Sequence, residues 1–425
     1  MADNTSQNGT LRRDLGLLDA VGIGLGAIIG AGIFVVTGVA AGVAGPAFIV
    51  GLLIAGVAAT CNALSSAELA ARYPQSGGTY EYGYRLLHPL LGFSAGWMFL
   101  ASKLAAGGTV ALGFGSYFSK IVPAVSPLTA AIGATVILTA ANLFGIKKAG
   151  QLNTLVVSVT LLSLIAFVIA GVPSLDGANL KPFAPAGISG IAEASALLFF
   201  AYTGYARIAT LGEEVHEPEK TIPRAVIITI VISIVLYLAV AMVAVGSVGS
   251  GALASSASPI ETAAGSFGSP IIVWIVTIGA TTAMLGVLLS QIVGISRMMF
   301  AMARRDDLPR FLEHTSQKFA VPDLGIILTG AVIVLLCLFG TLESILSAAA
   351  FTILLYYLIA NLAALKLSSP DKIFPRWIAV FGIICCVGLA LSLRGSVILY
   401  GLLMLIAGVA LRGGFQWLNR RSQHL

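Results

Sequence analysis

The sequence predicts an all-α protein that crosses a membrane many times, and three observations lead to this prediction. Hydrophobic residues make up 58% of the 425 residues and charged residues only 10%, with a mean hydropathy of +0.97. Soluble domains carry about 25% charged residues, so this composition fits a bilayer rather than water. Long apolar segments also recur from one end of the chain to the other. Segments of this length indicate helices, which satisfy their own backbone groups in lipid.

Twelve apolar segments are each close to the 20 or so residues that a helix needs to cross a bilayer. They cover residues 18–44, 46–70, 91–117, 125–145, 150–172, 189–212, 223–249, 268–302, 323–341, 344–366, 375–392 and 395–415. The segment 268–302 is longer than a membrane is thick, which predicts a helix that is tilted or extends into water. Polar tails at 1–17 and 416–425 flank the series. No soluble domain is expected, because the connections are short.

The basic residues divide these connections into two sides. If the N-terminus is cytoplasmic, eighteen lysines and arginines fall in cytoplasmic segments and only Lys120, Lys181 and Arg394 in outer ones. Cytoplasmic loops carry an excess of Lys and Arg, and an even number of crossings returns the chain to the side where it began. The sequence therefore predicts a multi-pass protein of the cell (cytoplasmic) membrane with both termini in the cytoplasm.

The cysteines and histidines do not suggest a metal or redox centre. All four cysteines lie in apolar segments without a zinc-type spacing, and the four histidines lie at polar ends. The net charge of +6 is read as a topology signal, so the lipid bilayer is an expected partner and nucleic acid is not. We expect no cofactor and no metal. The coupling ion, proton or sodium, and the oligomeric state stay open.

The stretch GAIIGAGIF, residues 26–34, places three glycines inside the first apolar segment. Each interior glycine costs a helix about 1 kcal/mol relative to alanine. An interruption here would expose amides of the following half-helix, which attract a carboxylate, and carbonyls of the preceding one, which attract an ammonium or a cation. The alternative is close helix packing, because Gly22, Gly26 and Gly30 have the spacing of a small-residue packing motif.

A second interruption is predicted at FFAYTGY, residues 199–205, where Gly204 lies in the middle of the sixth segment. Interruptions at matching positions of two halves are the sequence sign of an inverted-repeat carrier with its site at the membrane midplane. Residues 18–172 would form the first repeat and 189–366 the second. Residues 375–415 would add two further helices.

The sequence resembles the amino acid–polyamine–organocation (APC) permeases over nearly its whole length. The matching motifs, in matching order, are GIGLGAIIGAGIF (22–34), AELAARYPQSGGTYEYGY (67–84), FFAYTGY (199–205), GEEVHEPEKTIPRA (212–225) and SRMMFAMARRDDLP (296–309). The resemblance implies the LeuT-like five-plus-five fold, with helices 1 and 6 broken at the midplane, and secondary transport of amino acids.

The resemblance also implies which backbone groups hold the substrate. Its carboxylate would bind the amides of Ala31 and Gly32, beside Gly30. The family often has serine where Ala31 stands, so one hydroxyl contact is missing here. The carbonyls that would meet the substrate amine come from both interrupted helices, and they belong to Ile28, Phe200 and Thr203.

Side chains near the second interruption and on the eighth segment are further candidates by resemblance. The aromatic residues that would close over the substrate, next to Gly204, are Phe200, Tyr202 and Tyr205; the alternative for each is packing against lipid or the core. Gln291 matches a pocket position of the family, with Ser290 beside it. This polar pair could instead bond a neighbouring helix.

Three further residues are candidates for coupling or gating. Lys103 lies near the middle of the third segment, where a charge costs at least about 2.5–3.5 kcal/mol and is treated as functional by default; its alternative is structural capping or snorkelling. Several proton-coupled relatives carry a lysine where this chain has Thr160. In place of proton coupling at this position, Thr160 could coordinate sodium, or the protein could exchange substrates without an ion. Arg207 lies one turn past the second interruption and could form part of an inner gate, or snorkel to the cytoplasmic face.

The sequence therefore favours a secondary active transporter of amino acids that works by alternating access. Small neutral amino acids are the expected substrates, because no acidic residue lies near the midplane to hold a cationic side chain. The alternatives are an exchanger, or a carrier of acidic amino acids if Lys103 faces the pocket. An ion channel would need a filter-like loop, and a six-plus-six facilitator would need a long central loop. An enzyme would need a cluster of catalytic residues. The sequence shows none of these features.

Overall fold

The computed structural model of the protein describes residues 15–30, 32–73, 77–144, 149–209, 215–316, 318–368 and 372–422. Within these ranges the regular structure is helical, and one isolated β-bridge joins Leu15 to Val215. Seven helical stretches there are long and apolar enough to cross a membrane, judged by length and composition, and three shorter helices are also apolar. The all-helical, polytopic class is therefore confirmed, and the count of twelve crossings stays a prediction.

The helices follow the apolar segments of the sequence. The first half contains α1 (Leu17–Ile28), η1 (Gly32–Val36), α2 (Thr37–Ala44), α3 (Phe48–Arg72), α4 (Thr79–Leu86), α5 (Pro89–Ile121), α6 (Pro127–Leu143) and α7 (Ala149–Gly171). The second contains α8 (Gly187–Tyr202), η5 (Thr203–Tyr205), α9 (Ala206–Ala209), α10 (Pro218–Ala254), α11 (Pro259–Gly265), α12 (Pro270–Arg304), α13 (Asp323–Phe339), α14 (Leu342–Leu365), α15 (Arg376–Leu391) and α16 (Gly395–Ser422). Prolines begin five of these helices, since the first turn needs no N–H from that position.

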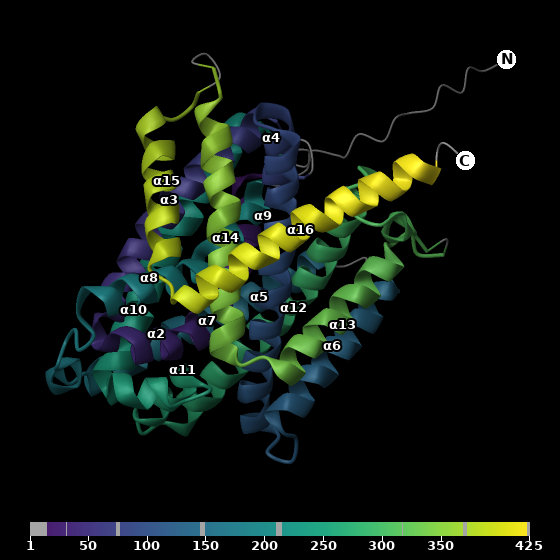
Figure 1. Cartoon of the computed structure of the whole chain (residues 1–425). Helices are drawn as coiled ribbons and strands as arrows, with labels where there is room; N and C mark the ends of the chain where they lie inside the picture. Colours follow the sequence, from purple (N-terminus) through teal and green to yellow (C-terminus); the bar gives the residue numbers. More distant parts are fainter. Residues whose placement is uncertain are drawn as a thin grey trace.

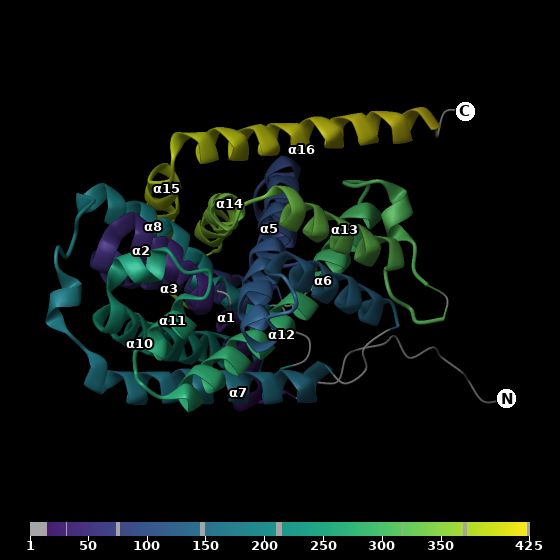
Figure 2. The ribbon, with the colours of Figure 1, turned by 90° about the horizontal axis from the view of Figure 1, so that it is seen from below.

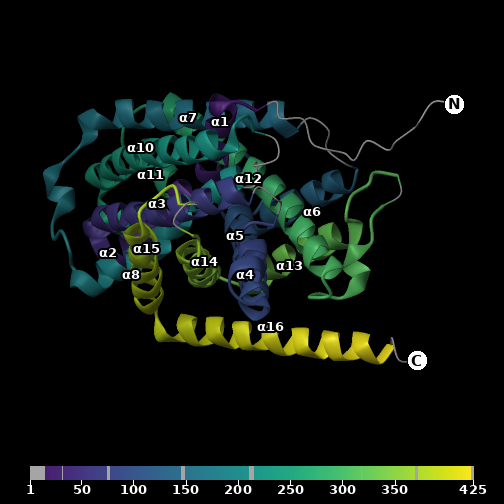
Figure 3. The same ribbon diagram turned by 90° about the horizontal axis from the view of Figure 1, so that it is seen from above.

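The helices form a bundle around α5, which contacts α4, α6, α12 and α14 (Figure 1). Helices α6 and α13 pack against each other on one side of the bundle. The views along the bundle place α7 along one edge and α16 along the opposite edge (Figures 2 and 3). The ends of α1 and α8, up to Ile28 and Tyr202, are buried among the other helices.

Large apolar side chains point outward around the rim of the bundle. Ile169 of α7 is 70% exposed, Phe339 of α13 84% and Ile406 of α16 64%. Apolar surface costs roughly 25 cal/mol per Å² when it is left in water, and continuous exposed apolar patches mark contact with lipid or protein. The rim thus has the chemistry of a surface that faces hydrocarbon.

Two of the described helices, α1 and α8, are interrupted at the glycine-containing stretches of the sequence. α1 ends at Ile28, Ile29 has extended backbone angles, and helical structure resumes at Gly32 as one π-helical turn. α8 ends at Tyr202 and continues through a single 3-10 turn, η5, into the short helix α9. These are the two stretches where the glycine pattern predicts interruptions. Ala31 lies outside the described residues.

A buried carboxylate ties α4 to α12 and α16. Asp307, which follows α12, is 1% exposed and accepts hydrogen bonds from the hydroxyls of Tyr80 (2.7 Å) and Tyr84 (2.5 Å). The guanidinium of Arg412 on α16 lies 2.7 Å from the same carboxylate. Burial, and then the bond to Asp307, raise the pKa of both tyrosines, so their hydroxyls stay protonated as donors. This network joins three segments that the predicted topology places on the cytoplasmic side.

Candidate functional site

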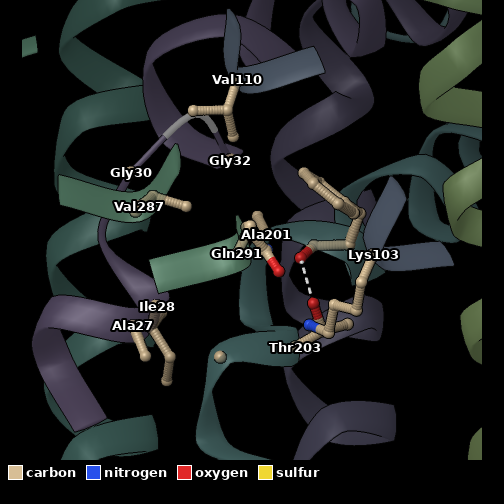
Figure 4. Close-up of a pocket in the computed structure, with 12 residues that line it drawn as sticks. Ala27, Ile28, Gly30, Gly32, Lys103, Val110, Ala201, Thr203, Val287 and Gln291 are labelled. Carbon is tan, nitrogen blue, oxygen red and sulfur yellow. Dashed lines mark hydrogen bonds between the residues drawn. The ribbon is translucent and has the colours of Figure 1, made fainter. Parts of the chain in front are cut away.

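A small cavity lies where the two interruptions meet. Its lining comes from both interruptions, from α5 and from α12 (Figure 4). The lining residues are Ala27, Ile28, Gly30, Gly32, Lys103, Val110, Phe200, Ala201, Thr203, Gly204, Val287 and Gln291. Its volume is about 30 Å³. A cavity needs about 10–15 Å³ by this measure to hold one water molecule, so the present conformation has room for a few waters.

The two interruptions touch each other through their glycines. A Cβ atom on Gly32 would lie 2.6 Å from the Cα of Ala201, and a Cβ on Gly204 would lie 2.1 Å from the carbonyl oxygen of Ala27. Both distances are far below van der Waals contact, so only glycine allows this approach of backbone to backbone. The glycines therefore serve contact between the interruptions. Gly22, by contrast, has no neighbouring atom within 4 Å of a Cβ position.

Tyrosines from two other helices bond the carbonyls that the interruptions leave open. The hydroxyl of Tyr237 on α10 donates to the carbonyl of Ile28 (2.8 Å), and that of Tyr357 on α14 donates to the carbonyl of Thr203 (3.2 Å). The carbonyl of Phe200 accepts from the hydroxyl of Thr203 (2.9 Å; Figure 4). Of the three carbonyls predicted to meet an amine, those of Ile28 and Thr203 each accept from a tyrosine hydroxyl, and that of Phe200 accepts from both the hydroxyl and the backbone amide of Thr203. A carbonyl oxygen has two lone pairs, so the tyrosine bonds occupy one lone pair each on the Ile28 and Thr203 carbonyls, while both lone pairs of the Phe200 carbonyl are bonded to Thr203.

The predicted aromatic residues divide between the cavity and the core. Phe200 lines the cavity. Tyr202 is fully buried away from it, with its hydroxyl 3.3 Å from the carbonyl of Leu52 on α3. Tyr205 is also fully buried, and its ring lies 5.2 Å from that of Tyr357. Neither is among the residues that line the cavity in the described part of the chain.

The polar pair on α12 divides in the same way. Gln291 lines the cavity and Ser290 does not, within the residues described. Val287, one turn before Gln291, also lines it, and a Cβ on Gly30 would meet its side chain at 2.7 Å. α12 therefore forms one wall of the cavity with an amide and a branched apolar side chain.

Lys103 brings a positive charge to this cavity. Its side chain is half-buried on α5 and lines the cavity, and Figure 4 shows it at the same end as Thr203. Its ammonium lies 5.6 Å from the centre of the Phe99 ring, one turn earlier on the same helix, a cation–π distance. No carboxylate lines the cavity in the described part of the chain. The cavity is thus positively charged overall.

The other two coupling candidates lie outside the cavity lining. Thr160 is 1% exposed on α7, and its hydroxyl donates to the carbonyl of Val156 at 2.7 Å. Arg207 lies in α9, beyond the second interruption, with a guanidinium nitrogen near Gly294 of α12. It is also within electrostatic reach of Lys103. The side chain of Arg207 therefore extends from α9 toward α12. In the sequence, Arg207 follows the cavity-lining residues Thr203 and Gly204.

Sequence reasoning missed several residues of this site. Tyr237 and Tyr357 carry the hydroxyls that bond the open carbonyls, and a signal for them existed, because buried tyrosines usually find a hydrogen-bond partner. Val110 and Val287 line the cavity without any such signal, since they resemble every other valine of an apolar helix.

Comparisons with known proteins place the chain in a family. The sequence profile of the family described as "Amino acid permease" matches residues 19–418. This chain belongs to the amino acid permease family. An uncharacterized transporter of Mycobacterium tuberculosis is 42% identical to the permease over 97% of this chain and 93% of its own length.

Relatives with named substrates are more distant. A branched-chain amino acid permease of Bacillus subtilis is 29% identical over 91% of this chain and 88% of that protein. The vacuolar cationic amino acid transporter 4 of Arabidopsis thaliana is 31% identical over 77% of this chain and 59% of that protein. The resemblance seen in the sequence motifs is therefore confirmed, and the permease is a multi-pass membrane protein of a family that transports amino acids.

Proposed function

We propose that this permease is a secondary carrier that moves small neutral amino acids across the cytoplasmic membrane by alternating access. The observation that carries the proposal is the mutual contact of the two interruptions, Gly32 against Ala201 and Gly204 against Ala27. Two open helix ends then face one cavity, as expected for a carrier whose site lies between inverted repeats. On this proposal residues 18–172 and 189–366 form the repeats of a five-plus-five architecture.

The substrate is held by backbone groups at its α-carbon end. Its carboxylate binds the amides that open η1, around Gly32, where the helix end is positive. Its ammonium binds the carbonyls of Ile28, Phe200 and Thr203, and the Phe200 carbonyl exchanges the bond from the Thr203 hydroxyl for the one from the ammonium. The bonds from Tyr237 and Tyr357 support this role, because they fix the direction of two of these carbonyls. The substrate side chain then extends toward α5 and α12.

Binding requires the site to open. At about 30 Å³ the cavity is far too small for an amino acid. α1 and α8, with α3 and α10 packed against them, form the group that moves against α5, α6, α12 and α13. Substrate shifts the equilibrium between the two conformations only by the difference between its affinities for them. In both conformations the substrate binds at the interruptions.

The sidedness of the proposal follows the basic residues. Long-range ion pairs of the structure join segments that the topology places on the same side, and they support it. On the proposed cytoplasmic side these pairs are Arg72–Glu219, Arg305–Glu81 and Arg412–Asp307, and on the outer side Lys120–Glu261, Arg394–Glu193 and Arg394–Glu343. Both termini are then cytoplasmic.

Lys103 favours one alternative substrate and disfavours another. A lysine in the cavity wall repels cationic side chains and could pair with the side-chain carboxylate of an acidic amino acid. Carriage of acidic amino acids is therefore the second candidate. Lys103 could also carry the coupling proton. In that case Thr160 has no role in coupling.

Uptake into liposomes tests these proposals. The purified permease takes up labelled amino acids from a panel of neutral, acidic and cationic members, with sodium and pH varied separately. Lys103→Ala is expected to reduce uptake by at least about tenfold where Lys103 carries the coupling proton or pairs with an acidic side chain, the loss of one charge-assisted interaction, while Lys120→Ala, an exposed lysine outside the cavity, is expected to have no effect. If the folded protein takes up no amino acid, the proposal of an amino acid carrier is overturned. If it prefers glutamate and aspartate, acidic amino acids replace neutral ones as the substrate class.

A further inference from the structure

A second, larger cavity opens above the first interruption. It has a volume of about 660 Å³ and lies between α2, the beginning of α8, the beginning of α14 and the connection from α15 to α16. We call it the outer vestibule, because the proposed topology places all of these segments on the outer side. Its wall includes Val35 of η1, and Gly32 at the other end of η1 lines the substrate cavity. One turn of helix thus separates the two spaces.

The charged residues of the outer vestibule form a single cluster. The guanidinium of Arg394 lies 3.1 Å from a carboxylate oxygen of Glu193 and 2.6 Å from one of Glu343. Glu193 belongs to α8, Glu343 to the first turn of α14, and Arg394 to the connection before α16. All three line the vestibule. One guanidinium is therefore shared by two carboxylates, which leaves one negative charge in excess.

This cluster matches the two charges of an amino acid. A guanidinium binds carboxylates with directed, charge-assisted hydrogen bonds, and two carboxylates that share one cation have capacity for an ammonium. The side chain of Arg394 is 57% exposed and that of Glu343 48% exposed. Ion pairs at such exposure contribute little net energy, so a ligand can exchange with them at small cost.

We propose that the outer vestibule is a second binding site, which takes the zwitterionic end of an amino acid before it reaches the substrate cavity. The α-carboxylate pairs with Arg394, and the α-ammonium lies between Glu193 and Glu343. The inference rests on the proposed transport of amino acids and adds a recognition step to it. Because Arg394 also joins α8 to α14, binding of the ligand loosens a link across the vestibule at the moment of loading.

Transport kinetics test the role of the charges. Arg394→Gln and Glu343→Gln are each expected to raise KM by about tenfold, the effect of losing one charge-assisted hydrogen bond, with the maximal rate within about twofold of the unsubstituted permease. The control is Lys120→Gln, which removes an outer-face ion pair with Glu261 that does not line the vestibule. An unchanged KM in both vestibule variants would overturn the site, and so would a fall in maximal rate alone.

A labelling experiment separates this site from the substrate cavity. Ala254 is exposed in the vestibule wall, and Ala254→Cys provides a thiol for a membrane-impermeant reagent, with the unsubstituted permease as background control. In a Gly204→Ala background, in which a Cβ forces the two interruptions of the substrate cavity apart, saturating amino acid is expected to slow labelling severalfold, and Arg394→Gln is expected to abolish this protection. Absence of protection overturns the vestibule site. If instead the unsubstituted permease takes up no amino acid, the proposed function fails.

Discussion

A methyl group at Gly204 is the smallest change that should separate the two interruptions. A Cβ there would lie 2.1 Å from the carbonyl oxygen of Ala27, 2.2 Å from its carbonyl carbon and 2.4 Å from the amide nitrogen of Ile28. All three are backbone atoms, so no side-chain rotation relieves the overlap. Real Cβ atoms essentially never approach closer than 3.0 Å. In Gly204→Ala, η5 must therefore move away from α1 by about 1 Å.

The size of the effect follows from this geometry. Overpacking a filled site costs typically about 1–3 kcal/mol. Here the added methyl group meets backbone atoms of Ala27 and Ile28, so we expect a cost at the upper end, about 3 kcal/mol. A displacement of about 1 Å in a binding constellation can reduce its rate about a hundredfold. We therefore expect Gly204→Ala to lower thermal stability measurably and to reduce amino acid uptake by about a hundredfold.

The matched control is Gly22→Ala, on α1, the helix that Gly204 packs against. No atom lies within 4 Å of its Cβ position, and alanine is the better helix former by up to about 1 kcal/mol. This variant is expected to keep normal uptake and equal or higher stability. Thermal unfolding in detergent and uptake in liposomes measure both variants, and normal uptake by Gly204→Ala would refute the packing of the two interruptions described above.

Three further substitutions test other parts of the structure. Tyr237→Phe removes the hydroxyl that bonds the last carbonyl of α1 and should weaken amino acid binding about tenfold; unaltered binding by calorimetry would contradict that role. Asp307→Asn leaves Arg412 without its buried partner and should destabilise the fold by about 3–5 kcal/mol, whereas Asp306→Asn, next to it and half-exposed, removes a surface pair with Arg310 and should leave the unfolding temperature nearly unchanged. Thr160→Ala should not alter the sodium dependence of uptake, because its hydroxyl bonds its own helix; a lost sodium response would return it to an ion site.

The sequence was sufficient to predict where the helices are interrupted, because glycine is the one residue that weakens a helix and also permits close backbone contact. It could not predict which side chains face the cavity. Ser290 and Gln291 differ by about 100° around α12, and the register of that helix against its neighbours decides which one points inward. Tyr202 follows Phe200 by two positions and so faces nearly the opposite way. These directions depend on packing between helices that are distant in sequence.

The charges of the two cavities together define which amino acids fit the proposed route. The outer vestibule has one negative charge in excess, from Glu193 and Glu343 against Arg394, and the substrate cavity has one positive charge, from Lys103. A cationic amino acid is attracted by the first and repelled by the second, and an acidic one meets the reverse order. Like charges in a poorly solvated site repel strongly. A neutral zwitterion is the one class that neither step rejects, and this argument places neutral amino acids ahead of acidic ones even though Lys103 lines the cavity.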